Sequence, residues 1–162
     1  MDTMAAVDLE LIEERNWREA LEVEVAADQA ALVTEYEPVA LMILAKCSVN
    51  PQGRRWEPLL VRDEHGAAVG VLALAHGADD CELRHVAIDS ARQGHGFGTA
   101  AIRAVVVRSQ QSESDCQELI VAAHPENQAA HSAYRSAGFD WNGELRNGEP
   151  VWRHKIERST DW

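Results

Sequence analysis

Gly94, Gly96 and Gly98 stand at alternate positions of one short stretch of the chain. A β-branched, apolar run at 83–88 precedes them, and apolar residues recur at helical spacing after them. A strand that leads through glycines into a helix lets the backbone come close to a ligand. The first amides of such a helix have no acceptor inside it and bind anions. The stretch therefore predicts a phosphate or pyrophosphate site.

Two common phosphate-binding loops fit this stretch less well. A Walker loop requires Lys and then Ser or Thr after its last glycine, but Thr99 follows Gly98 with no Lys between them. A dinucleotide-binding loop requires a third glycine where Thr99 stands, and an acidic residue at the end of the next strand. That strand ends here in Ala123 and His124. A glycine-rich turn without a ligand remains the alternative.

The elements that must position this stretch follow from apolar periodicity and turn residues. Strands are predicted at 8–13, 59–61, 68–75, 82–88, 119–123, 139–145 and 150–156. Helices are predicted from Asn16, at 28–33 and 38–47, after Gly98, and from 126 to 138. Asn16 is the predicted N-cap of the first helix, with Glu19 as its capping-box partner. This order predicts a single α/β domain over residues 1–162, with a mixed sheet.

A second stretch, 119–139, contains a strand, then Asn127, a helix with Tyr134, and the pair Gly-Phe. This stretch and the form Q-x-x-G-x-G at 93–98 resemble the two acetyl-CoA motifs of the GNAT superfamily of N-acetyltransferases. Their order and separation are also those of the superfamily. The resemblance covers about 59–156, and within the superfamily the layout is most similar to bacterial spermine/spermidine N-acetyltransferases. The segments that carry this narrower similarity are E-E-R-N-W at 13–17, P-E-N at 125–127 and G-E-L-R-N-G-E-P-V at 143–151.

The resemblance implies a mixed, mostly antiparallel sheet flanked by helices, whose splayed central strands hold acetyl-CoA. It implies cofactor-binding roles for Val86, Ala87, Ile88, Gln93, Gly94, His95, Gly96, Phe97, Gly98, Thr99, Asn127 and Tyr134. For Asn127 a helix N-cap is the alternative, and it does not exclude a bond to the cofactor. The resemblance also gives Tyr134 a catalytic role as the proton donor to the leaving thiolate. A core aromatic with a satisfied hydroxyl is the alternative for Tyr134.

The residue that removes the proton from the acceptor amine is left open. A free alkylammonium has a pKa near about 10.4, so some group must accept this proton. Glu82 stands where several family members place a catalytic Glu, but Arg84 shares its strand face and would lower its pKa. A surface ion pair with Arg84 is the alternative. His85 is the second candidate, because an unperturbed histidine has a pKa near about 6.5. Its side chain points to the face opposite to that of Glu82 unless a bulge intervenes. Transfer of the proton to water is the third possibility.

Charge favours a cationic acceptor. The formal net charge of −12 argues against nucleic acid as a partner, because phosphate backbones require a basic face. Acidic residues gather in the N-terminal part of the chain, where the resemblance places the substrate. Those predicted to bind it are Glu22, Glu24, Asp28 and Glu35, with Glu37 beside them. A solvated acidic surface is the alternative for this group.

Hydropathy, the first residues and the cysteines indicate the cellular location and the redox state of the protein. No apolar run reaches the roughly 18 residues that cross a bilayer, and the first residues carry no basic n-region, so no membrane partner or secretory signal is expected. Cys47, Cys81 and Cys116 form no CxxC motif, which indicates reduced thiols in a cytoplasmic protein. The histidines and cysteines show no metal-ligand spacing, so no metal is expected. Dimers are common in the family that the chain resembles, so a homodimer is one possible state.

The sequence thus predicts an acetyl-CoA-dependent N-acetyltransferase that acts on a primary amine of a small cationic acceptor, such as a polyamine, by direct attack. Other amines are the first alternative: an aminoglycoside, an amino acid or a protein N-terminus. Ala122 stands where ribosomal-protein acetyltransferases carry a Glu, which speaks against protein N-termini. A non-catalytic, acyl-CoA-binding regulatory module is the alternative from a different class.

Overall fold

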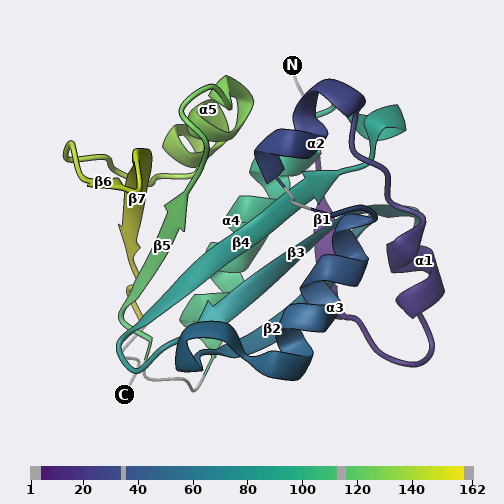
Figure 1. Cartoon of the computed structure of the whole chain (residues 1–162), viewed down its shortest axis with the longest axis horizontal. Helices are drawn as coiled ribbons and strands as arrows, with labels where there is room; N and C mark the ends of the chain where they lie inside the picture. Colours follow the sequence, from purple (N-terminus) through teal and green to yellow (C-terminus); the bar gives the residue numbers. More distant parts are fainter. Residues whose placement is uncertain (1–4, 34–35, 113–115, 159–162) are drawn as a thin grey trace.

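A seven-stranded mixed sheet runs through the computed structural model, which describes residues 5–33, 36–112 and 116–158 (Figure 1). The strand order is β1-β2-β3-β4-β5-β7-β6. β4 and β5 run parallel, and the other neighbouring pairs are antiparallel. The strands are β1 (Val7–Leu11), β2 (Arg55–Asp63), β3 (Ala68–His76), β4 (Asp80–Ile88), β5 (Glu118–Ala122), β6 (Leu145–Arg146) and β7 (Glu149–Lys155). The predicted mixed, mostly antiparallel sheet is confirmed.

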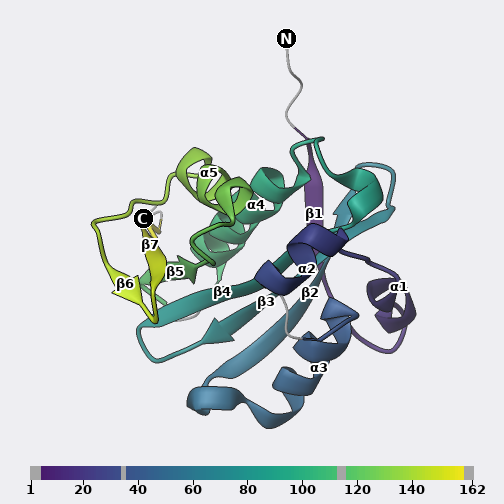
Figure 2. The same ribbon diagram turned by 45° about the horizontal axis from the view of Figure 1, so that its top comes forward.

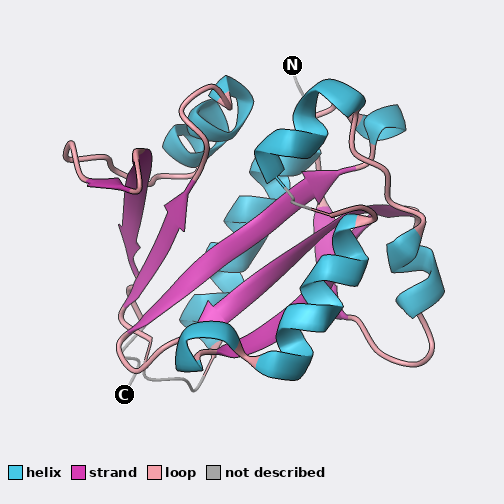
Figure 3. Cartoon of the chain, in the orientation of Figure 1, coloured by secondary structure: helices cyan, strands magenta, loops and turns pink. Residues whose placement is uncertain are grey.

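Helices cover both faces of this sheet (Figures 2 and 3). The helices on one face are α1 (Trp17–Leu21), α2 (Ala27–Val33) and α3 (Val39–Val49). Those on the other face are α4 (Phe97–Gln111) and α5 (Gln128–Ser136). Successive residues of β2 serve opposite cores, as strand geometry requires. Leu59 belongs to the core that contains Ile102 of α4, and Leu60 to the core that contains Ile43 of α3.

A β-bulge in β4 changes which side chains share a face. Ala73 of β3 pairs with Arg84 and Val71 with Ala87, so β4 carries one residue more than β3 between these pairs. His85 occupies the bulge, with a φ of 54°, in the left-handed region. The bulge breaks the alternation of side chains along β4 directly before Val86, the first residue of this strand that is predicted to bind the cofactor.

The bulge decides the position of His85. The ring of His85 stacks on Trp56, which lies in the α3-side core, with 6.1 Å between centroids. Glu82 pairs with Ala75 of the same core, so both side chains lie on the α3 side. Val86 packs against the α4-side core instead. Strict alternation along the strand would put Glu82 and Val86 on one face. The bulge puts them on opposite faces of the sheet.

The predicted capping box at the start of α1 is not formed. The Asn16 side chain makes no cap bond to α1. Its Oδ1 accepts from the Glu13 amide at 2.8 Å, and its Nδ2 donates to the Glu10 carboxylate at 2.6 Å. Glu19 pairs with Arg62 of β2 at 2.9 Å. Asn16 thus fixes the turn that follows β1, because the adjoining backbone groups need partners that α1 does not supply.

The closing hairpin is shorter than the sequence predicts. β6 contains two residues, not the predicted run 139–145, although the turn at Asn147 and Gly148 is as expected. Before β6, a single bridge joins Asp140 to Arg153. Gly143, with a φ of 96°, breaks the extended backbone between this bridge and β6.

A buried hydrogen-bonded pair joins α5 to β7. Trp152 Nε1 donates to His131 Nδ1 at 3.2 Å, so His131 Nε2 carries the proton and donates to the His124 carbonyl at 3.0 Å. We expect His131→Leu to lower the free energy of unfolding by about 1–3 kcal/mol, because both partners lose a buried bond. Urea unfolding measures this. The cost should shrink when Trp152→Phe is already present, and an equal cost in both backgrounds would contradict the coupling.

Among the described residues, no helix has both the length and the apolar character of a membrane span.

Candidate active site

The parallel strands β4 and β5 separate partway along the sheet. Their pairing ends at Leu83 and Val121, while β4 continues to Ile88 (Figure 1). A cavity of about 530 Å³ lies at this divergence. The expected splayed central strands are therefore present. Among the described residues, no strand pairs with this side of β4 beyond Leu83.

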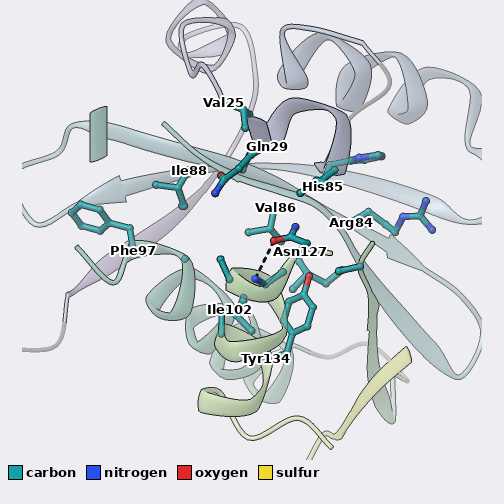
Figure 4. Close-up of a pocket in the computed structure, with 18 of the residues that line it drawn as sticks. Val25, Gln29, Arg84, His85, Val86, Ile88, Phe97, Ile102, Asn127 and Tyr134 are labelled. Carbon is teal, nitrogen blue, oxygen red and sulfur yellow. Dashed lines mark hydrogen bonds between the residues drawn. The ribbon is translucent and has the colours of Figure 1, made fainter. Parts of the chain in front are cut away.

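Most of the predicted cofactor residues meet at this cavity. Those that line it are Val86, Ala87, Ile88, Gln93, Gly94, Gly96, Phe97, Gly98, Asn127 and Tyr134. They come from β4, the glycine-rich loop, the start of α4 and the helix α5 (Figure 4). His95 of the loop and Thr99 of the first turn of α4 are not among the cavity-lining residues.

The glycine-rich loop leaves open space beside its backbone. Gly94 and Gly96 have φ values of 81° and 80°, a conformation that glycine adopts without strain. A Cβ at Gly98 would meet its nearest neighbour, Ile88 Cγ1, only at 3.8 Å. Crowding by the protein thus does not explain the glycine there. No side chain caps the start of α4, so its first amides remain available to an anion.

Side-chain bonds hold the loop against α2 and β2. Gln93 Nε2 donates to Gln29 Oε1 of α2 at 2.8 Å and to the Ile88 carbonyl at 3.4 Å. Arg92 lies 3.3 Å from Asp63 of β2. The loop is therefore positioned before any ligand arrives, with the Gln93 side chain engaged inside the protein.

Asn127 caps α5. Its Oδ1 accepts from the Ala130 amide at 3.2 Å, the contact drawn as a dashed line in Figure 4. The N-cap alternative considered from the sequence is therefore realised. Asn127 also lines the cavity, so the cap and a ligand contact are compatible.

Tyr134 is buried, and its hydroxyl points into the cavity (Figure 4). Its ring packs against Phe139 and Trp152, with centroids 6.2 and 6.3 Å away. Burial raises the pKa of Tyr134 above its ordinary value, and the carboxylate of Glu149 raises it further, while Arg84 opposes both. Within the described residues, the hydroxyl has no hydrogen-bond partner. A neutral phenol that faces a cavity is a proton donor without a protein acceptor.

Glu82 is engaged with arginines. Its carboxylate is buried and does not line the cavity. Arg146 lies 2.9 Å away, Arg84 3.4 Å and Arg54 3.6 Å. The ion pair with Arg84 considered from the sequence is therefore present, within a larger cluster. His85 does line the cavity, and its Nε2 lies 2.8 Å from Lys46 Nζ of α3.

Of the acidic residues predicted to bind the acceptor, the three that the structure describes do not line the cavity. Glu22, Glu24 and Asp28 are exposed and do not line it. Glu35 lies outside the described residues. The acidic residue that lines the described cavity is Glu149, which the sequence analysis did not select. The sequence feature that could have indicated Glu149 is its position directly after the Asn-Gly turn, which makes it the first residue of β7.

A match to a family model shows to which protein family the chain belongs. Residues 12–139 match the acetyltransferase (GNAT) family. The chain belongs to the GNAT acetyltransferase family. Among curated protein sequences, none matches this acetyltransferase at a significant level.

Solved structures of other acetyltransferases share the fold of this GNAT chain. The aminoglycoside acetyltransferase AAC(6')-Ib, in complex with paromomycin and acetyl-CoA, is 17% identical, with a TM-score of 0.74 over 93% of each chain. Spermidine N-acetyltransferase from Vibrio cholerae, in complex with CoA and spermine, is 17% identical, with a TM-score of 0.69 over 93% of this chain and 95% of that one. RimL, a ribosomal L7/L12 α-N-protein acetyltransferase in complex with CoA, is 16% identical, with a TM-score of 0.70 over 93% and 94%.

This GNAT acetyltransferase shows no metal centre among the residues that the structure describes, because no group of three or more His, Cys, Asp or Glu side chains is arranged to hold an ion.

Proposed function

We propose that the protein transfers an acetyl group from acetyl-CoA to a primary amine of a small cationic acceptor. One observation carries this proposal: a single cavity joins the open glycine-rich loop to the hydroxyl of Tyr134. The loop offers free amides to a pyrophosphate, and Tyr134 offers a proton at the other part of the cavity. A binding module without catalysis would have no use for a buried phenol directed into the ligand space.

The cavity fits acetyl-CoA in two respects. The space beside Gly98 is open, and the first amides of α4 carry no side-chain cap. The free side of β4 at Val86 and Ile88 can pair with an extended, amide-bearing arm. When bound, acetyl-CoA supplies an activated acetyl thioester.

We infer direct attack by the amine. The described residues that line the cavity include no serine, threonine or cysteine, so they offer none of these side chains as a covalent carrier of the acetyl group. Tyr134 then acts as the proton donor to the departing sulfur. The cavity walls can hold the amine near the acetyl carbon.

A polyamine is the acceptor that we propose to test first. The net charge of −12 and the similarity to an acetyltransferase solved with spermine support it. Glu22, Glu24 and Asp28 lie outside the described cavity, so they would act on a second ammonium only at the surface. Each exposed pair contributes about 0.2–1 kcal/mol.

A panel of amines with acetyl-CoA, read by thiol release, tests this function. We expect spermidine to exceed a monoamine of similar length by up to about fivefold in kcat/KM at low salt, because one exposed pair gives at most about 1 kcal/mol. The preference should fall at high salt, where exposed charges are screened. Equal efficiencies at low salt would remove the polyamine assignment, and no thiol release with any amine would remove the acetyltransferase function.

A further inference from the structure

Glu149 is a carboxylate without a partner in the cavity. It is the first residue of β7, its side chain is half-buried, and it lines the cavity near Tyr134. Among the described residues, none forms a hydrogen bond or ion pair with this carboxylate. A half-buried carboxylate that no protein cation contacts is available to a ligand cation in the cavity.

The register of the sheet explains why Glu149 reaches the site. Val151 of β7 pairs with Ala122, the last residue of β5. Glu149 lies two residues beyond this pair, past the end of β5, where β4 has already turned away. The carboxylate therefore stands at the open part of the divergence rather than inside the sheet.

Two arginines that would neutralise Glu149 are held elsewhere. Arg146 is its direct partner across the β6–β7 hairpin, the position at which opposite charges normally pair. The Arg146 guanidinium lies instead 2.9 Å from Glu82. Arg84 lines the same cavity, and its guanidinium lies 3.4 Å from Glu82. Glu82 thus binds both guanidiniums and leaves Glu149 unpaired.

We propose that Glu149 receives the ammonium group of the acceptor beside Tyr134, and that Glu82 is a positioning residue that keeps Glu149 free. This inference rests on the proposed N-acetyltransferase function. It places recognition of the reacting ammonium group on one carboxylate inside the cavity, whereas Glu22, Glu24 and Asp28 would contact only a second ammonium at the surface.

The proton balance is complete with these residues. The acceptor ammonium passes one proton to Glu149, which returns it to solvent. The amine nitrogen then attacks the acetyl carbon and displaces the sulfur, which takes a proton from Tyr134. The nitrogen loses its second proton as the amide forms, and this proton restores the Tyr134 hydroxyl through solvent. The net products are the acetylated amine, the free thiol and one proton.

The first test compares Glu149→Gln with Glu149→Asp and with Glu64→Gln, an exposed turn residue that also loses one charge. The probe is the best cationic amine of the panel. We expect Glu149→Gln to raise its KM about tenfold, equivalent to about 1.4 kcal/mol, with unchanged acetyl-CoA affinity. Glu149→Asp should restore part of this loss, and Glu64→Gln should behave as wild type.

The outcomes separate the inference from the function on which it rests. A KM within twofold of wild type in Glu149→Gln would overturn the role of Glu149 while the acetyltransferase function stands. A wild-type protein that acetylates no amine would overturn both.

A second test addresses Glu82. We expect Glu82→Gln to raise the KM for the cationic amine, because a released Arg146 can pair with Glu149. Adding Arg146→Gln should return the KM toward wild type, which a merely structural role of Glu82 would not produce. An unchanged KM in Glu82→Gln, or a double variant that stays impaired to the same extent, would overturn the positioning role.

Discussion

Tyr134→Phe is expected to lower turnover about 100-fold or more, because only the transition state loses its proton donor. Acetyl-CoA affinity should stay nearly unchanged, since the ring and its packing remain. The melting temperature should not fall, because the hydroxyl has no hydrogen bond within the described residues that its removal would break. Steady-state kinetics and a thermal melt measure the two quantities on the same sample.

The pH dependence and a control strengthen this test. Burial raises the pKa of Tyr134 above its ordinary value of about 10, so the phenol stays protonated as the fraction of free amine rises with pH. We therefore expect wild-type activity to rise with pH without a descending limb from Tyr134 below about pH 10. Tyr36→Phe removes the other tyrosine hydroxyl, on an exposed residue, and should keep full turnover. Full turnover in Tyr134→Phe would return Tyr134 to a purely structural role.

The glycine-rich loop gives the second large effect. At 100-fold excess over Kd, acetyl-CoA should stabilise the wild-type protein by about 2.7 kcal/mol, which is roughly 5–10 °C in melting temperature. Gly98→Val should abolish this shift, because its side chain would fill the space beside the loop where we place the phosphates. The fold should survive, since a Cβ at Gly98 meets its nearest neighbour at 3.8 Å and the backbone needs no positive φ there.

Gly98→Ala gives a sharper version of this experiment. Gly98 lies in the first turn of α4, where alanine favours the helix over glycine by about 0.5–1 kcal/mol. The free protein should therefore melt at a higher temperature while the acetyl-CoA shift decreases. Thr99→Ala, next along the helix but not on the cavity, should keep the full shift. A full acetyl-CoA shift in Gly98→Val would remove the loop from the binding site.

Local patterns were sufficient to predict the parts of the site that depend on neighbours in the chain. The glycine-rich turn, the helix after it and the Asn-Gly turn all follow from residues within one short segment. Resemblance to a family placed Asn127 and Tyr134 together. Both line the described cavity.

The features that the sequence did not reveal depend on pairing between distant segments. The face of His85 is decided by a bulge against β3, and periodicity along β4 alone does not reveal a bulge. The place of Glu149 depends on the register of β7 against β5. Glu19 was expected to complete the capping box of α1, but its carboxylate accepts a hydrogen bond from Arg62, which lies 43 residues away in the sequence.

The divergence of β4 and β5 also bears on aggregation, because it leaves part of one edge of β4 unpaired among the described residues. An open edge normally invites another polypeptide strand, with aggregation as the result. A regular strand needs neighbours about 4.8 Å away along its whole length. The space between β4 and β5 has this width only where the two strands still pair, up to Leu83 and Val121, and there β5 itself is the neighbour. The widening space therefore does not fit a regular β-strand of another chain, yet it leaves room for a ligand that is narrower than a polypeptide strand and carries only a few amide groups.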